Sequence, residues 1–302
     1  MAALPLTENN IVKKVYQRLL IFFLGLPSIV AMVVLLPWYH HLAFNVLTVI
    51  FSALGAAEFS VLLAQKKLCI PKWEAAALGG AIPAAMILTE SFGFNGLLIP
   101  AVIAGAVSWL LLSRIFSRGD ALNSSLNRMV AGFAALIYPG MLMAWIVRMS
   151  HWDNYASVII LTFLISVFAG DSAAWAVGML FGKGNQGIIP ASPNKSIAGF
   201  VGAIIAPILV GTGAALIFPD AFIPKYGLPS EFTPVAGAIL GLVTGIAATL
   251  GDLGESTIKR SSGLKDSGNV IPGRGGVLDS IDSIALAAPV FYMAFRLLFV
   301  RP

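Results

Sequence analysis

Residues 233–282 read TPVAGAILGLVTGIAATLGDLGESTIKRSSGLKDSGNVIPGRGGVLDSID, an apolar run (233–251) that gives way abruptly to charge. A hydrocarbon core about 30 Å thick needs roughly 20 apolar residues per helix, so the first part predicts a membrane-spanning helix. The second part holds five of the fourteen acidic residues of the chain, together with Lys259, Arg260, Lys265 and Arg274. Charges at membrane depth are costly and mark functional sites. This junction therefore predicts a helical membrane fold and a functional region.

The composition of the whole chain agrees with this interpretation. Of 302 residues, 58% are hydrophobic and 11% are charged, and the mean hydropathy is +0.89. A soluble domain carries roughly 25% charged residues, so the chain is predicted to be a polytopic membrane protein. The formal charge of +5 is explained by the Lys and Arg residues that collect in the cytoplasmic loops of membrane proteins. Because the basic residues are scattered over short loops, no nucleic-acid partner is expected.

The hydropathy pattern predicts an all-α transmembrane bundle of about nine helices. The candidate spans are 19–37, 42–64, 74–89, 96–113, 129–147, 156–181, 196–218, 233–251 and 279–300. We expect N-terminal transmembrane helices in residues 1–150. Residues 151–302 are expected to form a C-terminal transmembrane catalytic region with cytoplasmic loops 182–195 and 252–278.

Orientation follows from the basic residues. Fifteen of the 19 Lys and Arg fall in the N-terminal tail and in alternate loops, which the positive-inside rule places in the cytoplasm. The remaining four are Arg148, Lys225, Arg296 and Arg301. The polar loops therefore face cytoplasmic nucleotides. We expect a multi-pass protein of the bacterial inner membrane with its active site on the cytoplasmic side.

Carboxylates gather around the last loop. One helical face carries four polar residues at positions i, i+3, i+4 and i+7, namely Asp252, Glu255, Ser256 and Lys259. Asp279 and Asp282 are three residues apart, and Gly275-Gly276 permits a turn that folds them back on the first group. Clustered carboxylates need a divalent metal or several ordered donors to stay ionised. Asp252, Asp279 and Asp282 are the predicted Mg²⁺ ligands; Glu255 is either a fourth ligand or the ion-pair partner of Lys259. Interfacial salt bridges are the alternative for the whole group.

A second polar group lies upstream. Asp171 sits inside the apolar run 156–181, where an ionisable side chain indicates a functional site. The segment that follows places Ser192, Asn194 and Lys195 around Pro193. These donors suit a phosphate or a nucleotide, although an ordinary polar loop is the alternative.

Glycines recur at four-residue spacing in two predicted helices. Gly237, Gly241 and Gly245 form one series, and Gly178 with Gly182 forms another. Small residues at this spacing let helix backbones approach closely in lipid. They predict helix packing and carry no catalytic implication.

These motifs together resemble the phosphatidate cytidylyltransferase family, also called CDP-diacylglycerol synthases. The family signature is S-x-x-K-R-x4-K-D, a small residue, an aliphatic-Pro step, H-G-G and D-R-x-D. Matching positions are Ser256, Lys259, Arg260, Lys265, Asp266, Gly268, Ile271, Pro272, Gly275, Gly276, Asp279 and Asp282. Upstream, Gly251-Asp252-Leu253, Asp171, Phe181-Gly182-Lys183 and Ser192-Pro193-x-Lys195-Ser196 resemble further family elements.

The resemblance implies transfer of CMP from CTP to phosphatidate, which forms CDP-diacylglycerol and pyrophosphate. It also implies Mg²⁺, with a second cation left open, and a homodimer. The expected catalytic residues are Asp252, Lys259, Arg260, Lys265, Asp266 and Arg274. The expected substrate-binding residues are Ser192, Asn194, Lys195, Ser196, Ser256 and Asp171.

Three positions depart from the family pattern. Arg274 replaces its His, Ser280 its second Arg, and Ala198 a Glu. Arg274 cannot exchange a proton near neutral pH as His can, which puts full activity and the usual substrate in question. A related CTP-dependent enzyme acting on another lipid phosphate or a polyprenol, a membrane transporter and a non-catalytic scaffold remain alternatives.

Overall fold

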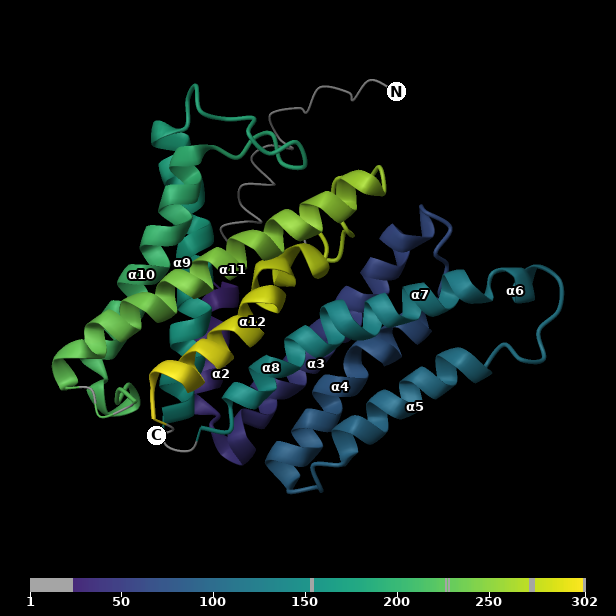
Figure 1. The fold of residues 1–302 in the computed structure, drawn as a ribbon, viewed down its shortest axis with the longest axis horizontal. Helices are drawn as coiled ribbons and strands as arrows, with labels where there is room; N and C mark the ends of the chain where they lie inside the picture. Colours follow the sequence, from purple (N-terminus) through teal and green to yellow (C-terminus); the bar gives the residue numbers. More distant parts are fainter. Residues whose placement is uncertain (1–23, 153–154, 226, 228, 272–274, 301–302) are drawn as a thin grey trace.

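The computed structural model of the chain describes residues 24–152, 155–225, 227, 229–271 and 275–300. It is built of α-helices joined by short connections (Figure 1). The helices are α2 (Leu26–Leu35), α3 (Trp38–Ala64), α4 (Lys72–Phe92), α5 (Leu98–Leu112), α6 (Asp120–Asn123), α7 (Ser125–Ala135), α8 (Leu142–Met149), α9 (Ala156–Phe181), α10 (Ile197–Ile217), α11 (Thr233–Ser261) and α12 (Leu278–Leu298).

The helical membrane fold is confirmed. Among the described residues, seven helices are long and apolar enough to cross a bilayer, and α2 and α5 are shorter apolar helices at two further predicted spans. The span predicted at 74–89 proves longer, since α4 covers 21 residues with Pro83 inside it. α7 and α8 form one span through the π-helical turn η2 (Leu136–Met141).

Pro139 explains this turn, because it lacks the N–H that a regular α-helix would use there. The carbonyl oxygen of Pro139 is 2.6 Å from the Ser52 hydroxyl of α3, which also lies 2.8 Å from the Gly79 carbonyl oxygen of α4. A hydroxyl donates one proton at a time, so it serves either carbonyl. This buried contact joins three helices of the N-terminal half.

The helices form two groups joined by α12. α3, α4, α7 and α8 pack together, and α9, α10 and α11 pack together on the other side (Figure 1). α12 contacts α11 and α9 of one group and α3 and α8 of the other. The predicted boundary at residue 150 falls between α8 and α9, and α12 packs against helices on both sides of it.

The glycine series brings α10 and α11 together, as the spacing predicts. A Cβ built on Gly241 would lie 2.8 Å from Cα of Ile208, and one on Gly237 would lie 2.8 Å from Cβ of Ala215. Gly178 of α9 likewise faces Gly199 of α10. Larger side chains at these positions would separate the helices that enclose the site described below.

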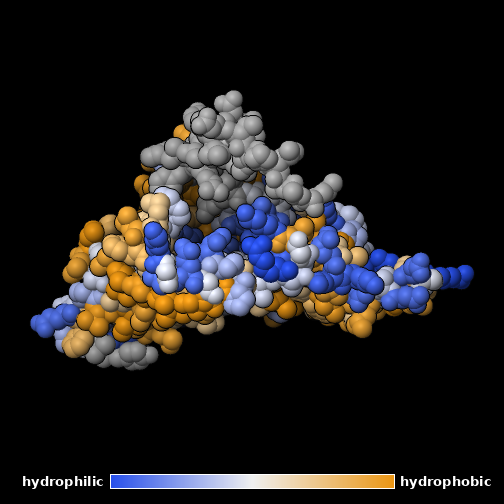
Figure 2. All heavy atoms as spheres, turned by 90° about the horizontal axis from the view of Figure 1, so that it is seen from above, coloured by the Kyte–Doolittle hydropathy of each residue, from blue (hydrophilic) through white to orange (hydrophobic). Residues whose placement is uncertain are grey.

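Much of the outer surface is apolar, as lipid contact requires. Large hydrophobic side chains are exposed along several spans, for example Trp175, Leu209 and Leu297. Hydrophobic residues cover broad areas of the face in Figure 2, and hydrophilic residues gather near its middle and at its right end. The buried core includes Trp152 stacked on Tyr292, with ring centroids 4.8 Å apart.

Candidate active site

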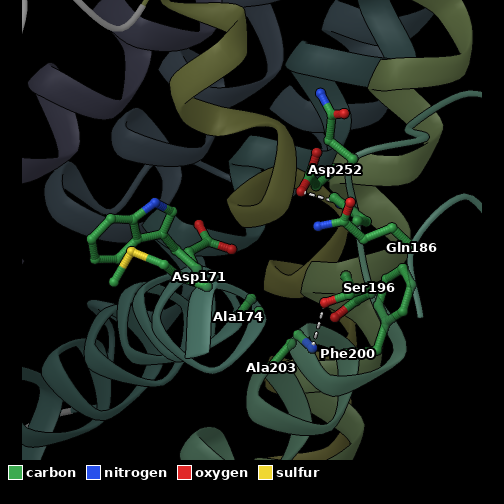
Figure 3. A pocket seen from close by; sticks show the side chains of 14 residues that line it. Asp171, Ala174, Gln186, Ser196, Phe200, Ala203 and Asp252 are labelled. Carbon is green, nitrogen blue, oxygen red and sulfur yellow. Dashed lines mark hydrogen bonds and ion pairs between the residues drawn. The ribbon is translucent and has the colours of Figure 1, made fainter. Parts of the chain in front are cut away.

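A cavity of about 410 Å³ opens between α9, α10 and α11 (Figure 3). α9 contributes Asp171 and α11 contributes Asp252, while the connection between α9 and α10 supplies further polar groups. The lining residues are Asp171, Ala174, Trp175, Gly178, Met179, Gln186, Asn194, Lys195, Ser196, Gly199, Phe200, Ala203, Thr249 and Asp252. The two polar regions singled out in the sequence thus meet around one cavity.

The connection between α9 and α10 is held by its own hydrogen bonds. Gln186 and Ser196 form an isolated antiparallel bridge, and the Asn185 carbonyl oxygen accepts from the Ile197 N–H at 3.1 Å. The Ser196 hydroxyl accepts from the Gly199 N–H at 3.1 Å, which caps the N-terminus of α10. This fold places Lys195 directly before the helix, at the cavity wall.

Lys195 forms an ion pair with Asp252 at the cavity wall. The side chains of the two residues are 26% and 31% exposed, so solvent or a ligand can compete for either charge. The Lys195 ammonium also lies 5.9 Å from the ring centroid of Phe200. A cation beside a carboxylate, in a cavity with amide and hydroxyl groups, can bind a phosphate once the pair opens.

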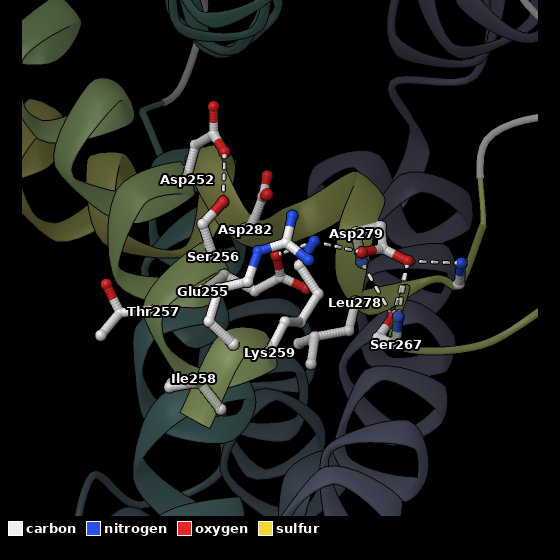
Figure 4. Close-up of polar contacts among 12 residues, drawn as sticks. Asp252, Glu255, Ser256, Thr257, Ile258, Lys259, Ser267, Leu278, Asp279 and Asp282 are labelled. Atoms are coloured by element: carbon white, nitrogen blue, oxygen red, sulfur yellow. Dashed lines mark hydrogen bonds and ion pairs between the residues drawn. The ribbon is translucent and has the colours of Figure 1, made fainter. Parts of the chain in front are cut away.

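A second polar cluster lies further along α11 (Figure 4). Lys259 pairs with Glu255 one turn away and, at 2.6 Å, with Asp279 of α12. The other oxygen of Asp279, Oδ2, accepts from the backbone N–H groups of Ser267 at 3.0 Å and Gly276 at 2.7 Å. The Ser267 hydroxyl lies 2.9 Å from the same oxygen.

The predicted carboxylate group is therefore divided. Asp279 points toward Ser267, whereas Asp282 lies between it and Asp252 in Figure 4. Asp282 is buried, and the negative charges of Asp252 and Asp171 both act on it. The Ser283 hydroxyl lies 3.5 Å from Asp171. Asp171 and Asp252 line the cavity, Asp282 lies near enough for both charges to act on it, and Asp279 belongs to the neighbouring cluster.

The remaining predicted residues lie around these two clusters. Ser256 is 3.5 Å from Asp252, and the Arg260 guanidinium donates to the Ala191 carbonyl oxygen at 3.3 Å. Ser192 lies in the turn before Lys195, whereas Lys265 and Asp266 are exposed. α11 continues to Ser261, so the irregular part of the predicted loop 252–278 begins at residue 262. The prediction for Arg274 falls outside the described residues.

The loop turns back at Gly275, as the glycine pair predicts. Gly275 has a φ of +113°, which favours glycine, and its backbone exchanges two hydrogen bonds with Ile271, at 2.8 and 3.1 Å. This turn brings Gly276 to Asp279. The turn thus folds the start of α12 back on the charged end of α11, where Asp279 pairs with Lys259.

Several residues that line the cavity were not predicted from the sequence. Thr249 lies three residues before Asp252 on α11, so helical periodicity could have found it. Gln186 follows no motif, and Trp175 and Phe200 looked like ordinary residues of apolar spans. Their place at the cavity depends on how three helices meet.

Only some of the carboxylates near the cavity are placed to hold a hard cation such as Mg²⁺. Within the described ranges, no three His, Cys, Asp or Glu side chains are arranged to hold a metal ion. Asp279 fits poorly as a ligand at the cavity, because it does not line the cavity and its Oδ2 is held by two backbone N–H groups and a hydroxyl. Asp252 and Asp171 do fit, since their carboxylates line the cavity and such oxygens are the ligands Mg²⁺ prefers.

The fold and the site define a polytopic helical membrane protein with a charged cavity between its spans. Residues 16–298 match the Cytidylyltransferase family, and the chain belongs to that family. Several relatives carry the name phosphatidate cytidylyltransferase, three of which illustrate the similarity. The Synechocystis protein is 35% identical over 150 residues, or 49% of this chain and 47% of the relative.

The other two relatives align over longer segments. The Bacillus subtilis protein is 32% identical over 164 residues, covering 54% of this chain and 56% of the relative. The Haemophilus influenzae protein is 34% identical over 200 residues, covering 63% of this chain and 66% of the relative. The chain thus spans about half to two thirds of the length of these relatives.

Proposed function

We propose that this protein transfers CMP from CTP to phosphatidate, forming CDP-diacylglycerol and pyrophosphate in phospholipid biosynthesis. Membership of the Cytidylyltransferase family and the names of the relatives support this reaction. The observation that carries it is the cavity itself. One wall presents Lys195 and Asp252, and another presents Trp175 and Met179, which are 69% and 63% exposed on a membrane-spanning helix. Such a cavity suits a substrate with a phosphate head and acyl tails.

The chemistry requires positioning and charge neutralisation more than a covalent intermediate. A phosphate oxygen of the lipid attacks the α-phosphorus of CTP. The new oxygen–phosphorus bond forms as the bond to the β-phosphate bridging oxygen breaks, and pyrophosphate leaves with that electron pair. Lys195 neutralises phosphate charge, with Asn194 and Ser196 beside it as hydrogen-bonding groups. Lys259 and Arg260 hold the adjoining end of α11.

We propose Mg²⁺ as the cofactor, held by Asp252 with Asp171, and with Asp282 close behind. When bound, the cation neutralises charge on the phosphate groups. The protein's part is to keep the two carboxylates, one on α9 and one on α11, in the lining of the same cavity. Lys195 must leave Asp252 for that carboxylate to become available.

The decisive experiment uses purified protein in detergent with phosphatidate, Mg²⁺ and CTP labelled at the α-phosphorus. Label should appear in a lipid product that co-migrates with CDP-diacylglycerol, and Asp252→Asn should lower its rate by orders of magnitude. In a parallel reaction with CTP labelled at the γ-phosphorus, label in the lipid product would indicate a lipid kinase. Substrate uptake into vesicles without CTP consumption would indicate a transporter. The absence of any lipid product from CTP would overturn the proposal.

We also propose that the chain is a homodimer in the bacterial inner membrane with its site facing the cytoplasm. The basic residues of alternate loops support the orientation. The resemblance to the family supports the proposed homodimer. Cross-linking in native membranes, followed by mass measurement in detergent, should give twice the monomer mass of 31.8 kDa.

A further inference from the structure

Glu58 is a buried acid in an apolar environment far along the sequence from the site. It lies on α3 beside the buried residues Ala56, Phe59 and Leu62, and is itself 9% exposed. Burying a carboxylate costs free energy unless other groups hydrogen-bond to it. Its partners therefore indicate what it does.

Those partners belong to the segment between α11 and α12. Oε2 of Glu58 accepts from the Leu278 N–H at 2.8 Å, and the Ser267 hydroxyl lies 3.0 Å from the same oxygen. Leu278 is the first residue of α12. The residue before it, Val277, makes no side-chain hydrogen bond that caps the helix. Glu58 thus supplies, from 220 positions away, the acceptor and the negative charge that stabilise a helix N-terminus.

Two glycines make room for this carboxylate. A Cβ built on Gly268 or on Gly276 would lie 2.8 Å from Cδ of Glu58. Both glycines are positions where the loop matches the family signature, while Glu58 lies outside that signature. The close approach explains why neither position can carry a side chain while Glu58 occupies its place.

The contact continues to the second polar cluster. The Ser267 hydroxyl lies between Glu58 and Asp279, at 3.0 and 2.9 Å, and the Asp279 N–H donates to it at 3.3 Å. Asp279 in turn accepts from Lys259 at 2.6 Å. Through these contacts, α3 is linked to the charged end of α11 and the start of α12. Asp282 lies one turn further along α12.

We propose that Glu58 is a positioning residue that sets the start of α12, and with it Asp279 and Asp282, for the cytidylyl transfer proposed above. Glu58 is not among the residues that line the cavity, so it is expected to act through α12. The expected effect of Glu58 on the reaction rate rests on the proposed function. The structural consequence, the ordering of residues 267–271 and 275–279, is measurable without any activity.

The test combines kinetics with hydrogen–deuterium exchange on the full-length protein. In Glu58→Ala, the Leu278 amide loses its acceptor and should exchange at least about tenfold faster. Misplacement of catalytic groups costs roughly up to a hundredfold in rate, so kcat should fall about ten- to a hundredfold while KM for CTP changes less than about twofold. Glu58→Gln keeps an acceptor oxygen and should recover part of both effects.

Ser60→Ala is the matched control, because Ser60 lies on the same helix, is buried, and donates only to the Ala57 carbonyl oxygen. It should leave kcat and Leu278 exchange unchanged. If Glu58→Ala does not fold, Leu278 exchange and kcat are measured in Glu58→Gln and Ser267→Ala instead.

The proposal would be overturned if the Glu58 variants showed unchanged exchange at Leu278 and unchanged kcat. It would also be overturned by a raised KM with a normal kcat, because that result would place Glu58 in contact with substrate. If the wild-type protein transfers no CMP, the proposed function fails. The exchange result then still decides whether Glu58 orders this segment.

Discussion

Replacing Lys195 by alanine tests whether the cavity binds phosphate. Lys195 pairs with Asp252, and both side chains are about a quarter to a third exposed. An ion pair with that exposure contributes no more than about 1 kcal/mol to stability. A charge-assisted contact to a phosphate is worth roughly 1.5–3 kcal/mol. Lys195→Ala should therefore leave folding nearly intact and lower kcat/KM for CTP about ten- to a hundredfold.

The assay measures CDP-diacylglycerol formation at varied CTP and saturating phosphatidate, with thermal unfolding recorded in the same detergent. Lys183→Ala is the matched control, because Lys183 belongs to the same connection and is exposed but does not line the cavity. It should keep the wild-type rate. Lys195→Arg should retain part of the activity, since it keeps the charge with a different geometry.

A wild-type kcat/KM of Lys195→Ala for both CTP and phosphatidate would show that Lys195 does not bind phosphate. An equal loss in Lys183→Ala would also contradict this role of Lys195, because the effect would then follow the general charge of the loop. A large fall in the unfolding temperature of Lys195→Ala would contradict the small stability effect expected for the ion pair.

Three further predictions follow from the packing and the charge distribution. Asp279→Asn removes the charge beside Lys259, whose side chain is 12% exposed, and should cost about 1–3 kcal/mol in unfolding free energy; an unchanged denaturation curve would contradict this. Gly241→Ala places a Cβ against the α10 backbone and should cost about 1–3 kcal/mol, whereas Gly213→Ala, which meets open space, should be neutral; equal effects would disprove the packing account. With Cys69 replaced, Ser262→Cys should react with an impermeant thiol reagent only after membranes are opened, and labelling from outside intact cells would reverse the orientation.

The spans and the glycine contacts were predictable because both depend on short-range periodicity. A run of about 20 apolar residues crosses a bilayer wherever it occurs, and four-residue spacing places glycines on one face. The same periodicity put Asp252 and Glu255 on one face of α11. An ionisable residue inside an apolar run pointed to Asp171, and the polar turn around Pro193 pointed to Asn194 and Lys195. Neither pattern showed that these residues surround one cavity with Gln186 and Thr249.

The grouping of the carboxylates was decided only by the tertiary structure. Spacing allowed Asp279 to join Asp252 and Asp282, but the folded chain offers Asp279 two backbone N–H groups, a hydroxyl and Lys259. Which donors a carboxylate meets depends on how the loop closes. That closure depends on Glu58, which is 209 positions from Ser267. Periodicity describes one helix at a time, whereas hydrogen bonds between distant segments exist only after the helices have packed.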